Sequence, residues 1–147
     1  MPINNQSALN VASGLINKYV EIFKRETTID TIMIGEPRSK VHNTTMYMLL
    51  ESVDRGRTAG IIPITYTILH RVIVSTANPE VAERYIIELS DLIPLIIEEN
   101  ITLDEYIQSG MAVIKTSSTG FITMNGAVLR FIDFTSTNLV KIALSRS

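Results

Sequence analysis

The fold is indicated most clearly by Ile64-Thr65-Tyr66-Thr67-Ile68-Leu69-His70-Arg71-Val72-Ile73-Val74, followed shortly by Asn78-Pro79-Glu80. Its apolar side chains alternate with polar ones such as Thr65, Thr67 and Arg71. This period of two predicts a β-strand that is buried mainly on one face, because successive side chains of a strand point to opposite sides of the sheet. A helix with almost no preceding loop is then predicted.

That helix has a strong start signal. Asn78 can accept hydrogen bonds from the free amides of the first turn, Pro79 suits the first helical position, and Glu80 faces the positive end of the helix dipole. The residues expected on its buried side are Val81, Ala82, Tyr85, Ile86, Leu89, Ile93, Ile96 and Ile97. Pro94 lies inside the helix, so we expect a kink or two abutting segments around Ser90.

The elements before this unit follow from simpler patterns. Apolar residues at steps of three and four predict a helix over Ser7–Arg25. Short runs of residues with high β-strand propensity predict strands over Thr31–Ile34 and Thr45–Val53. A Pro-bearing loop, Glu36–Asn43, separates these strands, and a loop with two glycines and two arginines, Asp54–Gly60, follows the second.

The last third of the chain is predicted to be mainly β-structure. A capping box at Thr102-Leu103-Asp104-Glu105 predicts one short helix before Gly110. Asn125-Gly126 is a strong hairpin signal, because both residues accept positive φ. The predicted strands are Met111–Lys115, Phe121–Met124, Ala127–Phe134 and Leu139–Leu144. The sequence therefore predicts one α+β domain over residues 1–147, with a largely antiparallel sheet and an N-terminal and a central helix packed against it.

Composition limits the possible functions. The 147 residues include no cysteine, which excludes disulfides and thiolate metal sites. No signal peptide and no apolar run of about eighteen residues is present, so we expect neither export by a cleaved signal nor a membrane partner. The net charge of −2 gives no general attraction to nucleic acid. Because 46% of residues are hydrophobic and only 19% are charged, surplus apolar surface predicts a homo-oligomer.

Histidines and carboxylates give no convincing catalytic or metal site. His70 is in phase with Ile68 and Val72, so we expect a buried imidazole bonded to a polar neighbour. His42 lies in a loop and has no second ligand at metal-binding spacing, and we expect no metal and no cofactor. The adjacent carboxylates of Glu98-Glu99 and Asp104-Glu105 do not converge on one substrate, since neighbouring helical side chains lie about 100° apart. They are expected to be solvated.

Nucleophilic and phosphate-binding motifs are also lacking. No serine lies in a Gly-x-Ser-x-Gly turn. The loop Gly56–Gly60 resembles a phosphate loop in composition, but it lacks the Gly-Lys-Ser/Thr ending and precedes a strand rather than a helix. We therefore predict no catalytic residues.

The remaining candidates are the basic residues of the two loops. Arg38, Lys40 and His42 precede the strand at Thr45–Val53, and Arg55 and Arg57 follow it. These loops either lie at opposite ends of that strand or fold toward a common rim. They are either solvated or form a surface that contacts protein partners or faces DNA. Base stacking is not expected, because aromatic residues are not interleaved with these cations.

The order of the predicted elements is similar to one phage protein family. A long amphipathic first helix, a hairpin with a mobile loop, the strand-to-helix unit Ile64–Asn100 and a C-terminal hairpin resemble the tail terminator, or head-to-tail joining, proteins of long-tailed bacteriophages. Pro94 and the turn at Thr102–Gly110 depart from the pattern.

The resemblance implies a non-enzymatic ring, usually hexameric, that ends the tail tube and docks the tail to the capsid neck. Its partners would be tail-tube and neck or connector proteins, and DNA would pass through the lumen without sequence-specific binding. The protein would be found in the virion after assembly in the host cytoplasm.

Two alternatives stay open. One is a small α+β domain, ligand-binding or enzymatic, that uses His42 and the neighbouring arginines on an anionic ligand. The other is a different neck or tail-tube component of similar topology. A polar pocket that joins His42 to convergent arginines would favour the first alternative, whereas a ring with a protein-lined lumen would favour the terminator.

Overall fold

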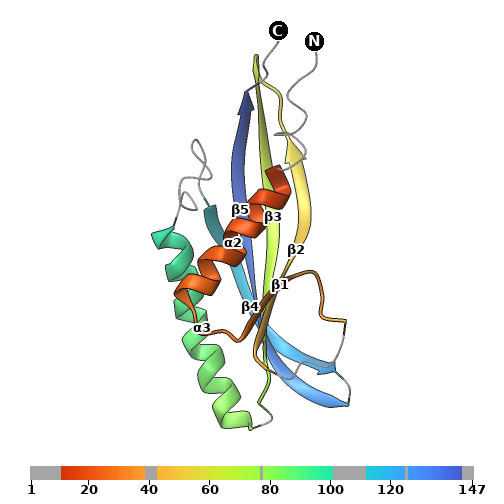
Figure 1. Ribbon diagram of the computed structural model, residues 1–147, viewed down its shortest axis with the longest axis vertical. Helices are drawn as coiled ribbons and strands as arrows, with labels where there is room; N and C mark the ends of the chain where they lie inside the picture. The colour runs from red at the N-terminus through yellow and green to blue at the C-terminus, as the bar shows by residue number, and fades with distance from the viewer. Residues whose placement is uncertain (1–10, 39–42, 77, 101–111, 125, 144–147) are drawn as a thin grey trace.

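The computed structural model describes residues 11–38, 43–76, 78–100, 112–124 and 126–143, which form a sheet and two helices. In chain order the elements are α2 (Val11–Glu26), β1 (Thr31–Ile34), β2 (Thr45–Arg55), β3 (Ile61–Val74), α3 (Pro79–Glu99), β4 (Ala112–Met124) and β5 (Ala127–Ala143). The predicted α+β class, with a helix near the N-terminus and a central helix, is confirmed (Figure 1). The predicted turn over residues 102–110 lies outside the described residues.

The five strands form one sheet in the order β1-β2-β3-β5-β4, with β3 at its centre. The pair β1–β2 is parallel, and the other three pairs are antiparallel. β3 pairs with β5 along its whole length, from Ile61 opposite Ala143 to Val74 opposite Arg130. On its other edge β3 pairs with β2 as far as Arg55. The sheet is therefore built around the strand that the sequence signals most strongly.

The alternation predicted for β3 is confirmed. The apolar side chains at Ile64, Tyr66, Ile68, Val72 and Val74 are all buried. They share one core with α2 and α3, so both helices cover the same face of the sheet. The polar residues between them are partly exposed and face the other side. That second face carries a smaller apolar cluster around Tyr47, Ile73 and Leu129.

α3 begins as predicted, at a cap formed by Asn78. The side-chain oxygen of Asn78 accepts hydrogen bonds from the amides of Glu80 (3.1 Å) and Val81 (3.2 Å). The buried residues of the helix are Ala82, Ile86, Leu89, Ile93, Ile96 and Ile97. The prediction for Val81 was wrong: its side chain is 52% exposed, because it lies at the edge of the stripe that faces the sheet.

Pro94 does not divide α3, which continues as one helix from Pro79 to Glu99. Of the two alternatives expected at Pro94, a kink or two abutting segments, the second was therefore wrong. Proline removes a single backbone donor from the helix ladder. Buried residues on both sides of it, Leu89 and Ile93 before and Ile96 and Ile97 after, hold both halves of the helix against the same core.

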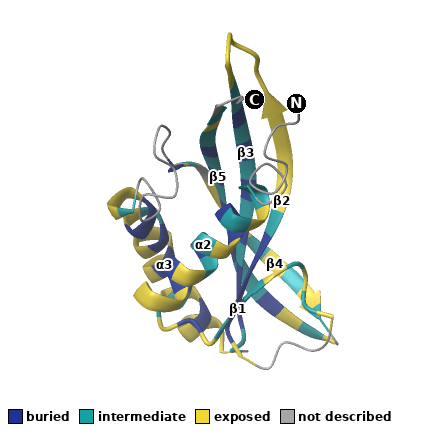
Figure 2. Cartoon of the chain, turned by 45° about the horizontal axis from the view of Figure 1, so that its top comes forward, coloured by how far each residue is buried: buried dark blue, intermediate teal, exposed yellow. Residues whose placement is uncertain are grey.

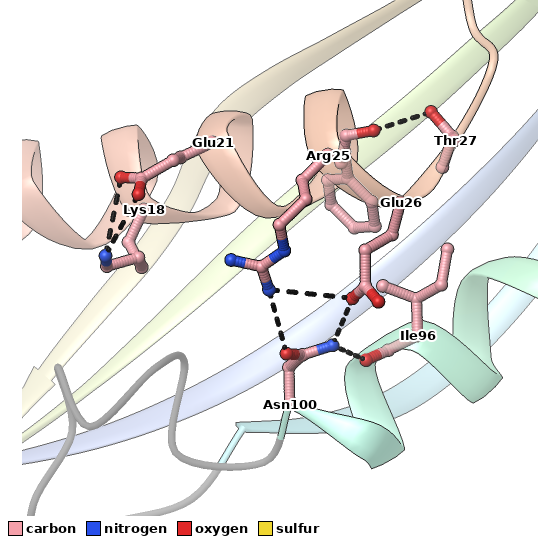
Figure 3. A network of polar contacts seen from close by, with 8 residues as sticks. Lys18, Glu21, Arg25, Glu26, Thr27, Ile96 and Asn100 are labelled. Atoms are coloured by element: carbon pink, nitrogen blue, oxygen red, sulfur yellow. Dashed lines mark hydrogen bonds and ion pairs between the residues drawn. The ribbon is translucent and has the colours of Figure 1, made fainter.

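α2 is held in place by apolar packing and by polar contacts at its end. Its buried side chains are Leu15, Ile16, Tyr19, Ile22 and Phe23, which pack into the core. Its last turn is tied to the end of α3 by polar contacts (Figure 3). The side-chain amide of Asn100 donates to Glu26 Oε2 (2.6 Å) and to the carbonyl of Ile96 (2.7 Å), and Arg25 donates to Asn100 Oδ1 (3.2 Å). The two helix ends are thus held together.

The C-terminal half of the sheet differs from the prediction of four short strands. β4 and β5 are each continuous, and β4 pairs with β5 through the polar residues 116–119. Pairing along a long neighbour overrides the weak local signal of such residues. A register shift between Ile114 and Thr116 marks a bulge.

Met124 pairs with Ala127, so the predicted hairpin is confirmed, with Gly126 at a φ of 81°. Asn125 lies outside the described residues.

Replacing Ile68 tests the assignment of the core face of β3. Ile68→Asp should unfold the domain, because it places an unpaired carboxylate in a fully buried site at a cost of several kcal/mol. The neighbouring change Thr67→Asp is the matched control, since Thr67 is partly exposed on the opposite face. Far-UV circular dichroism with urea titration should find the control folded. A native-like Ile68→Asp protein would contradict the assignment.

Candidate functional site

The basic candidate residues that the structure describes, Arg38, Arg55 and Arg57, are not brought to one place. Arg38, Arg55 and Arg57 are all exposed. Arg38 lies in the connection that leads into β2, whereas Arg55 ends β2 and Arg57 lies in the following turn. The two loops lie at opposite ends of β2 (Figure 1). Lys40 and His42 lie outside the described residues. Of the five candidates, only Arg55 and Arg57 therefore form a local pair that the structure describes.

The segment around these two arginines projects from the body of the protein. We call residues 50–61 the arm. Every residue of the arm is exposed, including Leu50 (42%), Val53 (41%) and Ile61 (40%). β1 pairs with β2 only as far as Met48. Beyond that point no described strand covers the outer edge of β2, and the arm stands clear of both helices (Figure 2).

The tip of the arm is an ordered turn. The amide of Gly56 donates to the carbonyl of Pro63 (2.8 Å), and Thr58 and Ile61 exchange two backbone hydrogen bonds of 3.1 and 3.2 Å. Gly60 takes a φ of 75°, which favours glycine. Because the amides of Gly56 and Thr58 already have carbonyl partners, they are not free to cradle a phosphate.

The register of the arm sorts its side chains between two faces. Partners directly opposite each other in an antiparallel pair lie on the same face. Three arm residues pair with buried residues of β3: Leu50 with Ile68, Val53 with Tyr66, and Arg55 with Ile64. Burial raises the pKa of the Tyr66 phenol, and the positive charge of Arg55 opposes this shift. The helix-side face of the arm thus carries two apolar side chains and a guanidinium.

A second group of polar residues is buried between α2 and the sheet. His70 Nε2 lies 2.7 Å from Ser136 Oγ. The side-chain amide of Asn138 donates to Ser136 Oγ (3.1 Å) and to the carbonyl of Tyr66 (3.2 Å), and the Tyr19 hydroxyl donates to Asn138 Oδ1. The predicted environment of His70, buried beside a polar neighbour, is confirmed. Its partners were missed, although Ser136 and Asn138 are in phase with Phe134.

The distance between His70 and Ser136 would suit a nucleophile and its base. However, the pair lacks access for a substrate and a third group that orients the imidazole. Both residues are 0% exposed, so a substrate cannot reach Ser136. His70 Nδ1 has no hydrogen-bond partner, whereas a catalytic histidine is oriented by a third group at that nitrogen. Burial lowers the pKa of His70 to about 3, which leaves the imidazole neutral at physiological pH. The group therefore acts as a structural network that anchors α2.

The second face of the sheet, opposite the two helices, holds another polar contact that local sequence patterns did not predict. Arg71 donates to both carboxylate oxygens of Asp133, at 2.7 and 2.8 Å, and to the Tyr47 hydroxyl at 3.3 Å. Its guanidinium lies 4.2 Å from the centre of the Phe131 ring. These contacts raise the pKa of Arg71, chiefly through the hydrogen bonds to Asp133. All the guanidinium's strong interactions are made within the sheet.

One cavity of about 420 Å³ opens beside the start of α3. Its charged lining residues are Asp30, Arg84 and Glu88, and Arg84 is already paired with Glu80 at 3.1 Å. Two carboxylates and one neutralised guanidinium do not favour an anionic ligand. Within the described ranges, no three His, Cys, Asp or Glu side chains are placed to hold a metal ion.

Comparison with known proteins gives no family. No protein-family model and no curated protein matches the chain. Among the described helices, none is long and apolar enough to cross a membrane.

The buried histidine predicts a specific loss of stability in acid. Its pKa is about 3 in the folded protein and about 6.5 when unfolded, so the unfolded state binds the proton first. The stabilising contribution is complete above pH 6.5 and is lost as the pH falls toward 3, by roughly 4 to 5 kcal/mol in total. His70→Gln, which cannot titrate, should lose less stability over this window in urea unfolding. Equal losses in the two proteins would contradict the prediction.

Proposed function

We propose that this protein is a non-enzymatic structural component of a long-tailed bacteriophage. In this proposal several copies form a closed ring, of six by analogy with tail terminators, that ends the tail tube and joins the tail to the capsid neck. The ring would be part of the virion after assembly in the host cytoplasm. The element order supports this, because α2, the β2–β3 hairpin, the β3–α3 unit and the β4–β5 hairpin follow the pattern that suggested the resemblance.

The observation that carries the proposal is the arm. Although Leu50 and Val53 pair with core residues of β3, they are exposed together with Ile61, so the arm leaves apolar side chains in contact with water. Such a segment is suited to insertion against another protein, where its apolar side chains leave water. In the part of the chain that the structure describes, no strand pairs with the outer edge of β2 beyond Met48, and an edge of this kind also favours contact with a second chain.

Ring closure would follow from heterologous contact. One patch of each copy meets a different patch on the next, and the rotation between copies closes after a few subunits. A projecting arm on one side of a compact body provides such an unequal pair of surfaces. The tail-tube and connector proteins would then meet the two faces of the ring.

DNA would pass through the lumen without being read. The net charge of −2 gives no general affinity for phosphates, and sequence-specific binding needs side chains that reach base edges. Arg55 and Arg57 serve subunit or partner contact in this proposal rather than base recognition.

The double change Arg55→Ser with Arg57→Ser tests the proposal. Both residues are exposed, so the free energy of unfolding should change by no more than about half a kcal/mol. Assembly should fail instead: in phage deprived of their own copy of this protein, the variant should leave tails of abnormal length or unjoined heads and tails, visible by electron microscopy.

Lys24→Ser is the control for that experiment, because Lys24 is an exposed cation of α2 far along the chain from the arm. This variant should support a normal yield of virions. A normal yield from the arginine double variant as well, with loss of an activity on a small anionic compound, would overturn the proposal in favour of a ligand-binding domain.

A further inference from the structure

α3 has a second apolar surface that the sheet does not cover. Leu95 is 50% exposed, Ile87 56% and Leu92 37%, although the helix buries a full stripe on its other side. Leu92 and Leu95 are three residues apart, so their side chains are neighbours on the helix surface. We call this outward side of α3 the outer face.

The outer face is strongly acidic. α3 carries six carboxylates and one arginine. Two of its carboxylates are neutralised, since Glu83 pairs with Arg130 (3.0 Å) and Glu80 with Arg84 (3.1 Å). The other four form no ion pair with any described residue, and they are Glu88, Asp91, Glu98 and Glu99. Asp91, Glu98 and Glu99 lie at i−4, i+3 and i+4 from Leu95, so they surround it.

The helix-side face of the arm has the opposite character. Leu50 and Val53 provide apolar area next to Arg55. Neither Arg55 nor Arg57 forms an ion pair within the part of the chain that the structure describes. On the arm an apolar pair lies next to Arg55, and Arg57 follows two residues later, which matches the apolar pair on α3 with carboxylates around it.

The two surfaces cannot meet within one molecule. The arm projects at one end of the sheet, while α3 packs along the other part of it, against β4, β5 and β3 (Figures 1 and 2). A contact between them therefore requires a second copy of the chain.

We infer that the arm of one copy docks on the outer face of α3 in the next copy. Leu50 and Val53 pack on Leu92 and Leu95, and Arg55 and Arg57 meet the surrounding carboxylates. The contact is heterologous, so it leaves a free arm at one end of every pair and a free outer face at the other, and it repeats until the ring closes. This inference rests on the proposed ring and names its subunit interface.

Cysteine cross-linking tests the contact directly, because the natural chain has no cysteine. Val53→Cys and Leu95→Cys proteins are mixed and mildly oxidised. A disulfide forms only where two Cα atoms come within about 7 Å, so the mixture should give a heterodimer that neither variant gives alone. A single chain with both changes should give a ladder of covalent multimers. As control, Val128→Cys, on another exposed residue, should not link to Val53→Cys.

Charge reversal provides the second test. Arg55→Glu with Arg57→Glu, and separately Asp91→Arg with Glu98→Arg, should each abolish self-association measured by sedimentation velocity, with and without tail tubes. An equimolar mixture of the two should restore it, because every contact then joins opposite charges. Electrostatic attraction of this kind also weakens with salt, so wild-type assembly should decline as salt is raised.

The outcomes separate the interface from the ring itself. Suppose that the wild-type protein forms rings. If the charge-reversed variants also assemble, or if Val53→Cys and Leu95→Cys do not link, the docking inference is overturned and the proposed function stays intact. A wild-type chain that stays monomeric under every condition, including with tail tubes, would overturn both.

Discussion

The pairing of β3 on both of its edges determines where the other described elements lie. A strand of period two tolerates no slip, since a shift of one residue would turn Thr65, Thr67 and Arg71 into the core. Continuous pairing with β5 fixes the register over all of β3. The helices are then placed relative to this strand. α3 starts at a cap only a few residues beyond its end, and α2 is anchored through Tyr19 and Asn138, whose amide binds a carbonyl of β3.

Local signals predicted much of this fold, and long-range contacts account for what they missed. β3 and the cap at Asn78 were predicted correctly because their signals lie within a few residues. The prediction broke β5 in two because Ser136 and Asn138 interrupt its apolar pattern. Both are fully buried, and their polarity is satisfied by His70 and Tyr19, which are distant in sequence. No local rule anticipates such partners.

The candidate site was predictable to a similar extent. Arg55 and Arg57 were marked by the composition of their loop, and the structure keeps them together on the arm. For their apolar neighbour Val53 the sequence predicts only a place in a strand, because its exposure depends on where β1 stops pairing with β2. The outer face of α3 was visible in principle, since Leu95 falls outside the stripe assigned to the core. The arm and the outer face each carry charged side chains that form no ion pair with any described residue. This absence of ion pairs can be recognised only from the structure.

We propose that a stable body, built on β3, presents two unlike surfaces that close into a ring. Native mass spectrometry of the purified protein, or of protein released from assembled tails, measures the number of copies in this ring. Ring closure predicts one dominant species at an integral multiple of 16.4 kDa greater than two, expected at six. A monomer under all conditions, or a dimer that never grows, would contradict it, because a self-complementary dimer leaves no unlike surfaces to close a ring.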